Sequence, residues 1–224
     1  MNKREVLQRI AEVGVVPVVR AASAAEAMQV VEAIKAGGLT VLEITLTVPR
    51  AVRVIEQLTD TYGEEVLVGA GTVLDAATAR ACILAGAQFI VSPALDLGTI
   101  ACCRKAGVAV MPGALTPTEV LQAWTAGADF VKVFPCSAVG GASYIKALKA
   151  PLPQVELIPT GGVSLQTAAS FIEAGAAALG VGADLCDLKA VRAGQTEKLT
   201  ETARAYIDAV RAARGGSSAA THGS

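Results

Sequence analysis

Two charged residues of this chain stand inside segments that are otherwise apolar. Lys132 lies in the run Asp129-Phe-Val-Lys-Val-Phe-Pro135, and Glu43 lies in Val41-Leu-Glu-Ile-Thr45. Such runs are typical of strands buried on both faces, where an isolated charge is costly. Burial lowers the pKa of a lysine, and the free amine is the form that attacks carbonyl carbons. The pattern favours a lysine nucleophile with a carboxylate that moves protons, and the alternative is an ion pair that serves only the fold.

Other reactive residue types are scarce. The single histidine, His222, lies in a Gly-, Ser- and Ala-rich C-terminal tail, so the folded part offers no imidazole for catalysis or for metal binding. The cysteines are odd in number and show no C-x-x-C spacing, which predicts reduced core residues rather than a zinc site or a disulfide framework. They are Cys82, Cys102, Cys103, Cys136 and Cys186. We therefore expect no metal and no cofactor.

The composition limits the partners. The chain has 224 residues, 53% of them hydrophobic, and a formal charge of -1, so nothing in its charge predicts binding to nucleic acid. No apolar run reaches the roughly 18 residues of a membrane span, and the N-terminus does not resemble a signal peptide. We expect a cytoplasmic protein without a membrane partner.

The elements that position these residues follow a repeated pattern. Five Ala-Gly pairs, at residues 36, 85, 106, 126 and 174, each follow a helical segment and precede a short apolar strand. The expected strands are Val15 to Arg20, Val41 to Thr45, Leu67 to Gly71, Phe89 to Ser92, Val108 to Met111, Phe130 to Phe134, Glu156 to Pro159 and Ala178 to Val181. Eight strand-helix units predict a (β/α)8 TIM barrel with an extra N-terminal helix, and an open doubly wound sheet is the alternative. We expect one domain over residues 1–213 and a disordered tail over residues 214–224.

Active sites of such barrels lie where the strands end. Arg20 ends the first strand, where its guanidinium group can bind a carboxylate or can simply be exposed. Two glycine-rich loops follow the last two strands: Pro159-Thr-Gly-Gly-Val163 and Gly180-Val-Gly182-Ala183. Backbone N–H groups of such loops can hold a phosphate, although Gly-Gly also marks ordinary tight turns.

The chain resembles the 2-keto-3-deoxy-6-phosphogluconate (KDPG) and 4-hydroxy-2-oxoglutarate aldolase family. The resemblance extends from Val15 to Ala213 and rests on VLEITL, VGAGTV, FIVSP, MPG, FVKVFP and PTGGV in this order. It implies a class I aldolase with Lys132 as the Schiff-base lysine and Glu43 as the acid and base. It also implies substrate contacts, which fall on Thr72, Pro93, Phe134 and Thr160. Further implications are a homotrimer, 2-keto acid and aldehyde substrates, and no metal.

Two departures from the family pattern bear on the substrate. Some members carry an arginine where this chain has Thr47, so we assign the substrate carboxylate to Arg20, as in other members. The last loop often reads Gly-Ser, whereas Gly182 is followed here by Ala183 and Asp184. We expect Gly161, Gly162, Gly182 and Ala183 to bind a phosphate, and we expect the acid at position 184 to weaken that binding.

The function that we expect is cleavage of KDPG to pyruvate and glyceraldehyde 3-phosphate. The same chemistry on 4-hydroxy-2-oxoglutarate, the galactonate stereoisomer or an unphosphorylated keto-deoxy sugar acid is an alternative. A sugar-phosphate isomerase or epimerase is an alternative of another class, because phosphate-binding barrels share the two glycine loops. A non-catalytic barrel is a third.

Overall fold

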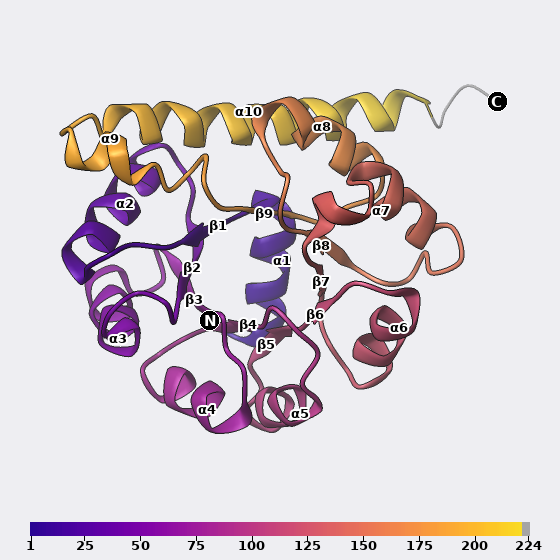
Figure 1. Ribbon diagram of the computed structural model, residues 1–224, viewed down its shortest axis with the longest axis horizontal. Helices are drawn as coiled ribbons and strands as arrows, with labels where there is room; N and C mark the ends of the chain where they lie inside the picture. Colours follow the sequence, from indigo (N-terminus) through magenta and orange to yellow (C-terminus); the bar gives the residue numbers. More distant parts are fainter. Residues whose placement is uncertain (221–224) are drawn as a thin grey trace.

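The computed structural model describes residues 1–220, with side chains through residue 215. His222 and the end of the predicted tail lie outside the described residues. The strands are β1 (Val15–Val19), β2 (Val41–Thr45), β3 (Leu67–Gly71), β4 (Phe89–Val91), β5 (Ala109–Met111), β6 (Gly113–Ala114), β7 (Val131–Val133), β8 (Leu157–Pro159) and β9 (Leu179–Val181). The helices are α1 (Lys3–Val13), α2 (Ala24–Ala36), α3 (Ala51–Tyr62), α4 (Ala76–Leu84), α5 (Leu97–Ala106), α6 (Pro117–Thr125), α7 (Ala142–Lys149), α8 (Leu165–Glu173), α9 (Leu188–Arg192) and α10 (Glu197–Ala220), with a short 3-10 helix at Cys136–Val139. The strands lie inside a ring of helices (Figure 1).

The strands form parallel sheets, which confirms the prediction of a parallel α/β fold. The ladders are a six-stranded sheet in the order β5-β4-β3-β2-β1-β9 and a three-stranded sheet in the order β6-β7-β8, rather than one continuous eight-stranded ladder. The break falls at Pro112, between β5 and β6. Proline has no N–H group to donate to a ladder. The chain therefore pairs with β4 before Pro112 and with β7 after it.

Helix α1 closes one end of the interior. Its Val6 and Ile10 are buried together with inward-facing side chains of the strands, among them Phe89 and Phe130. The helix begins at a capping box formed by Asn2 and Glu5. Figure 1 shows α1 crossing behind the centre of the strand ring. This end of the interior is thus filled with apolar side chains, which leaves the opposite end for a site.

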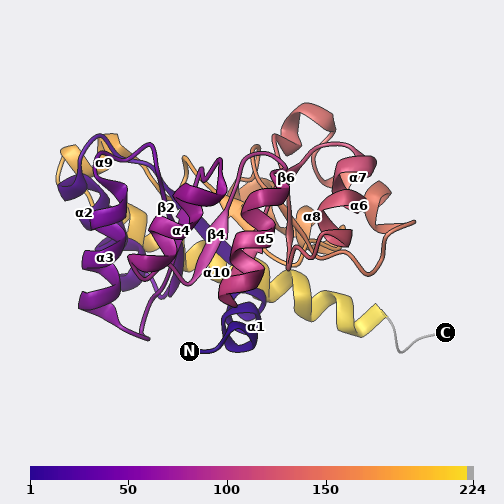
Figure 2. The same ribbon diagram turned by 90° about the horizontal axis from the view of Figure 1, so that it is seen from below.

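Helix α10 continues past residue 213, where the sequence places the start of a disordered tail. The guanidinium group of Arg214 donates to the carbonyl oxygens of Ala11 at 2.7 Å, Glu12 at 2.8 Å and Ala177 at 3.0 Å. These bonds fix α10 to the end of α1, and the helix extends through Ala220 (Figure 2). The composition of the tail does not reveal this anchor because its acceptors are backbone atoms far away in the sequence.

Candidate active site

Lys132 and Glu43 face each other across the interior. Lys132 is on β7 of the three-stranded sheet, and Glu43 is on β2 of the six-stranded sheet. The Lys132 Nζ atom lies 4.0 Å from Glu43 Oε1, and their side chains are only 6% and 2% exposed. The separation is too long for a hydrogen bond. The two charged groups are therefore close enough to attract each other, but neither satisfies the hydrogen-bonding capacity of the other.

Local features of the strands give both side chains their direction. Alternation along β7 and its flanks puts Phe130, Lys132 and Phe134 on one face. Phe130 lies deeper among the inward-facing apolar residues, and the Phe134 ring lies 5.2 Å from Lys132 Nζ, where its face stabilises an ammonium group. On β3, Gly71 leaves room for Glu43, because a Cβ atom there would come within 2.5 Å of Oε1.

The carboxyl group of Glu43 holds its proton more tightly than usual. Burial raises its pKa, and the opposing charges of Lys132 and Arg20 only partly offset this effect. Within residues 1–220, Oε1 has no hydrogen-bond partner. An unpartnered buried carboxyl oxygen is costly, and it is suited to accepting a proton from a bound molecule.

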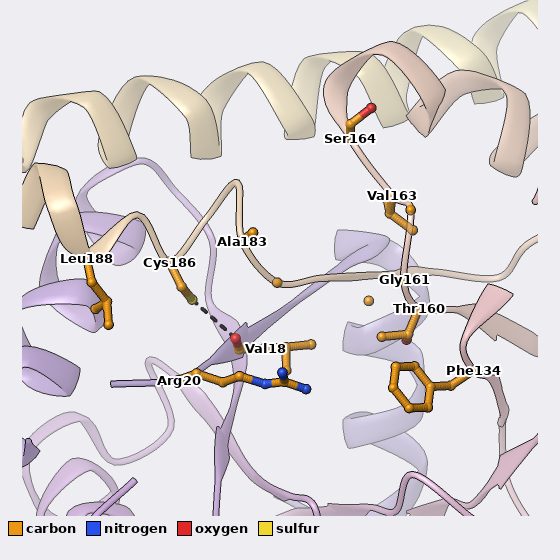
Figure 3. Close-up of a pocket in the computed structure, with 13 residues that line it drawn as sticks. Val18, Arg20, Phe134, Thr160, Gly161, Val163, Ser164, Ala183, Cys186 and Leu188 are labelled. Carbon is orange, nitrogen blue, oxygen red and sulfur yellow. Dashed lines mark hydrogen bonds between the residues drawn. The ribbon is translucent and has the colours of Figure 1, made fainter. Parts of the chain in front are cut away.

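An open cavity of about 550 Å³ adjoins this pair (Figure 3). Its lining consists of Val18, Arg20, Phe134, Thr160, Gly161, Gly162, Val163, Ser164, Gly180, Gly182, Ala183, Cys186 and Leu188. Seven residues expected from the sequence are among them: Arg20, Phe134, Thr160, Gly161, Gly162, Gly182 and Ala183. Lys132 and Glu43 do not line the cavity, and Phe134 is the contact between its wall and the buried amine.

The two remaining predicted residues lie elsewhere. Thr72 follows β3 and Pro93 follows β4; both are half-buried, and neither lines the cavity. Thr72 has a left-handed backbone with φ of 60°. Pro93 packs so closely on Gly113 that a Cβ atom on Gly113 would overlap its carbonyl group. Pro93 therefore packs on Gly113, the residue that pairs with Lys132 across β6 and β7. Neither Thr72 nor Pro93 reaches the open cavity.

The glycine loops present unused backbone donors. The N–H groups of Gly162, Gly182 and Ala183 make no turn, loop or cap hydrogen bond within the described part of the chain, whereas Gly161 lies next to the bridge between Thr160 and Gly180. Gly161 and Gly162 have φ of 88° and 76°, which favours glycine at both positions. Free N–H groups on two adjoining loops can hold an anion without any cationic side chain.

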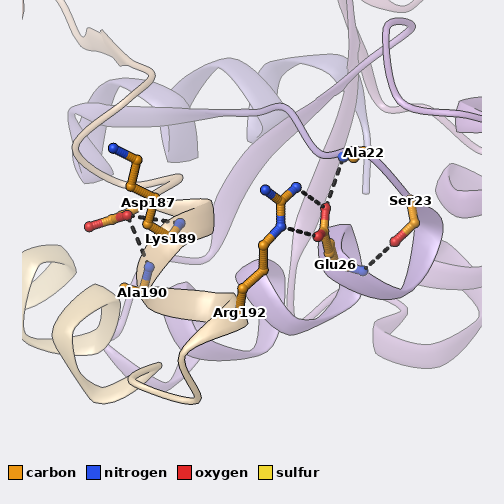
Figure 4. Close-up of polar contacts among 7 residues, drawn as sticks. All are labelled: Ala22, Ser23, Glu26, Asp187, Lys189, Ala190 and Arg192. Carbon is orange, nitrogen blue, oxygen red and sulfur yellow. Dashed lines mark hydrogen bonds and ion pairs between the residues drawn. The ribbon is translucent and has the colours of Figure 1, made fainter.

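The loop that follows Arg20 is held in place by a polar contact network (Figure 4). The Glu26 carboxylate accepts from Ala22 N–H at 3.0 Å and from Arg192 Nε at 2.7 Å. Arg192 and Ala22 both lower the pKa of Glu26. Helix α9 and the end of β1 are thereby linked, and Figure 3 shows the Arg20 side chain extending toward Phe134 at the cavity. Arg20 is the one arginine or lysine among the lining residues described.

The other six residues of the cavity wall were not among the expected site residues, namely Val18, Val163, Ser164, Gly180, Cys186 and Leu188. The thiol of Cys186 donates to the Val18 carbonyl oxygen at 3.2 Å, and burial raises its pKa to about 12. Cys186 is therefore a protonated, unreactive thiol in the wall, not a nucleophile. Its place just after a predicted glycine loop was the available signal.

Within residues 1–220, no three His, Cys, Asp or Glu side chains gather as a metal-binding group. No helix in that range is long and apolar enough to cross a membrane.

Comparison with known proteins identifies the family to which this chain belongs. A family model described as KDPG and KHG aldolase matches residues 6–202. This chain belongs to that aldolase family. Among its relatives, the 2-dehydro-3-deoxy-6-phosphogalactonate aldolase of Escherichia coli K12 is 38% identical over 200 residues, which cover 88% of this chain and 95% of that protein. The KHG/KDPG aldolase of Escherichia coli K12 is 31% identical over 197 residues, 88% of this chain and 92% of that protein.

Solved structures of aldolases from this family share the fold. A native KDPGal structure has a TM-score of 0.81 and 36% identity, over 90% of this chain and 96% of the other. The KDPG aldolase of Legionella pneumophila, with pyruvate captured as a covalent carbinolamine intermediate, has a TM-score of 0.81 and 29% identity, over 90% of this chain and 97% of the other. The chain is accordingly an aldolase, a carbon-carbon lyase of class I that works through a covalent Schiff base with pyruvate. The family predicted from the motifs is confirmed.

Proposed function

We propose that this aldolase cleaves KDPG to pyruvate and glyceraldehyde 3-phosphate, with Lys132 as the nucleophile and Glu43 as the general acid and base. One observation carries the proposal: the buried amine of Lys132 faces an unpartnered buried carboxyl oxygen 4.0 Å away, beside an open cavity. An ion pair that served only the fold would gain from a closer, hydrogen-bonded contact.

The reaction uses both groups in turn. The neutral amine of Lys132 attacks C2 of the keto acid, and loss of water gives an iminium ion. Glu43 then removes the proton of the C4 hydroxyl group, and the C3–C4 bond breaks with its electron pair moving toward the iminium nitrogen. Glyceraldehyde 3-phosphate leaves and an enamine remains. Glu43 returns the proton to C3, and water hydrolyses the imine to release pyruvate and the Lys132 amine.

The cavity supplies a binding partner for each end of this substrate. Arg20 pairs with the carboxylate next to C2, because a guanidinium group fits a carboxylate with two hydrogen bonds. Phe134 and Thr160 border the pyruvate moiety from the cavity wall, and Thr72 and Pro93, which do not line the cavity, border it from the ends of β3 and β4. The N–H groups of the two glycine loops, at Gly161, Gly162, Gly182 and Ala183, hold the phosphate.

The proposal includes the architecture of one domain over residues 1–213. The two sheets form one closed (β/α)8 barrel, with α1 as the extra N-terminal helix. Closure is supported by the bridge between Thr160 and Gly180, which joins β8 to β9, and by the hydrogen bond from Asp129 N–H, just before β7, to the Val110 oxygen of β5 at 3.0 Å. A homotrimer in the cytoplasm completes the proposal. Assembly into an oligomer is supported by a similar protein cage, 35% identical over 93% of this chain and 76% of the other, that was designed by fusing symmetric oligomeric domains.

Borohydride reduction in the presence of pyruvate tests the nucleophile. Peptide mass spectrometry is expected to find a pyruvate-derived adduct on Lys132 and no adduct in the folded Lys132→Ala variant. An adduct on another lysine would reassign the nucleophile. The absence of any adduct on the folded wild-type protein would overturn the mechanism.

The galactonate stereoisomer is a second candidate substrate. It is favoured by the 38% identity to a 2-dehydro-3-deoxy-6-phosphogalactonate aldolase. Measuring kcat/KM for the two phosphorylated stereoisomers, for their unphosphorylated forms and for 4-hydroxy-2-oxoglutarate decides among them. We expect the highest value for KDPG, and a higher value for any other compound overturns that choice.

A further inference from the structure

The acidic residue that departs from the family pattern is not free to face the cavity. Asp184 lies in the loop between β9 and α9, directly after Gly182 and Ala183. Its Oδ2 atom accepts a hydrogen bond of 2.8 Å from the hydroxyl group of Tyr206 on α10. Asp184 is absent from the cavity lining, whereas Gly182 and Ala183 belong to it. The expectation that this acid repels a phosphate requires its carboxylate to face the cavity, whereas the carboxylate is bonded to Tyr206.

Tyr206 is a rigid support for this contact. Its side chain is fully buried, and α10 packs along α8 and α2. Burial and the hydrogen bond to Asp184 both raise the pKa of the phenol, so the hydroxyl group stays a donor. A hydrogen bond to a charged acceptor is stronger than one between neutral groups. The loop is thereby fastened to the outer helix layer from the side opposite the cavity.

The rest of the loop forms a tight turn around the residues that line the cavity. The N–H groups of Leu185 and Cys186 both donate to the Gly182 oxygen at 3.1 Å. The thiol of Cys186 donates to Val18 on the cavity side. Asp184 and Cys186 are thus side-chain anchors of this turn, and Asp184 reaches α10. Asp187, at the start of α9, also contacts α10 through Lys198 Nζ at 2.9 Å, but it lies after the residues that line the cavity.

We propose that Tyr206 is a positioning residue for substrate binding. Through Asp184 it fixes Gly182 and Ala183, so that their free N–H groups point at the anionic group on the aldehyde half of the substrate. This inference rests on the proposed function, and it adds a residue that does not touch the substrate. Binding by a few backbone N–H groups depends on their direction, so a loosened loop weakens the contact to that anion and leaves the bonds to C2 unchanged.

The central test is Tyr206→Phe, which removes one hydroxyl group. We expect KM for KDPG to rise about fivefold, the size of one lost hydrogen bond, with kcat within about twofold. KM for the unphosphorylated keto-deoxy acid and trapping of pyruvate on Lys132 should stay unchanged. An unchanged KM for KDPG, or an equal rise with the unphosphorylated compound, overturns the proposal.

Variants of Asp184 show whether this side chain supports the loop or repels the phosphate. Because Asp184 is exposed, its substitution is tolerated, so these variants also serve as the test if Tyr206→Phe fails to fold. Asp184→Asn keeps an oxygen acceptor, so KM for KDPG should stay within about twofold. Asp184→Ala should raise KM as Tyr206→Phe does, and the double variant should be no worse than either single one. If the carboxylate repelled the phosphate, Asn and Ala would both lower KM.

Thr200→Val is the matched control on the same helix. The Thr200 hydroxyl group donates to the Ala33 oxygen at 2.9 Å, so the variant loses one α10 hydrogen bond that does not reach the loop. Its KM for KDPG should be that of the wild type, and a fivefold rise would mean that loss of α10 stability explains the effect. Pyruvate trapping separates the two proposals: if the wild-type protein traps no pyruvate, both fall, whereas normal trapping with unchanged KM in Tyr206→Phe overturns only the positioning role.

Discussion

Gly71 on β3 lies against the carboxyl group of Glu43 on β2, so closely that a Cβ atom on Gly71 would come within 2.5 Å of Oε1 and 2.7 Å of the carboxyl carbon. The backbone of Gly71 is not in the left-handed region. The requirement at position 71 is therefore for space beside Glu43, not for a conformation that other residues avoid.

Gly71→Ala should displace Glu43 while the strand persists. We expect kcat for cleavage to fall ten- to a hundredfold, because a displacement of about 1 Å at a catalytic group can cost two orders of magnitude. Borohydride trapping of pyruvate on Lys132 should fall far less. Gly98→Ala is the control, since a Cβ atom there would meet only ordinary contacts, the nearest at 3.4 Å. If trapping and turnover fell equally, the idea that Gly71 provides room for the Glu43 carboxyl group would be contradicted.

Glu43 should make stability depend on pH. Its folded pKa is raised by burial above the ordinary value of 4.5. Its contribution to stability is therefore fully present below about pH 4.5 and is lost as pH rises through the folded pKa. We expect urea unfolding to show that, as pH rises from about 4.5 through the folded pKa, the free energy of unfolding of the wild-type protein falls relative to that of Glu43→Gln. A shift in the opposite direction would show that the folded pKa is depressed.

The thiol of Cys186 should resist alkylation. With a pKa of about 12 and a hydrogen bond to Val18, it is protonated at pH 8. Iodoacetamide at that pH is expected to label Cys186 at least tenfold more slowly in the native protein than in urea. Mass spectrometry of the labelled peptides measures both rates, and equal rates would exclude a protected thiol.

Arg214 should stabilise the fold although it lies beyond the boundary expected from the sequence. Arg214→Ala removes the three hydrogen bonds to Ala11, Glu12 and Ala177. We expect the free energy of unfolding to fall by about 2 kcal/mol, since hydrogen bonds of charged donors contribute more than neutral ones. Arg211→Ala, at an exposed position of the same helix, should cost less than about 0.5 kcal/mol. Comparable losses in the two variants would show that Arg214 is not a specific anchor.

The sequence revealed what depends on local signals. Ala-Gly helix ends and apolar runs located the strands, and the positions of Lys132 and Glu43 followed from those strands. The break at Pro112 could have been expected from the missing N–H group, but the change of partner strand depends on tertiary packing. The partner of Asp184 could not be read from the sequence, because Tyr206 lies on a helix that begins only after α9. The same holds for Cys186, whose thiol reaches the carbonyl group of Val18 at the other end of the chain.

The break at Pro112, between β5 and β6, affects what determines the distance between Lys132 and Glu43. The two residues belong to different ladders, and the strand pairing that connects these ladders within residues 1–220 is the isolated bridge between Thr160 and Gly180, so register constrains the distance between Lys132 and Glu43 less than it would inside one ladder. A ladder can change only in whole-residue steps, whereas packed side chains between two ladders shift by fractions of an ångström. Exchanging a single methyl group in the interior can therefore adjust the distance between nucleophile and base without altering any strand pairing.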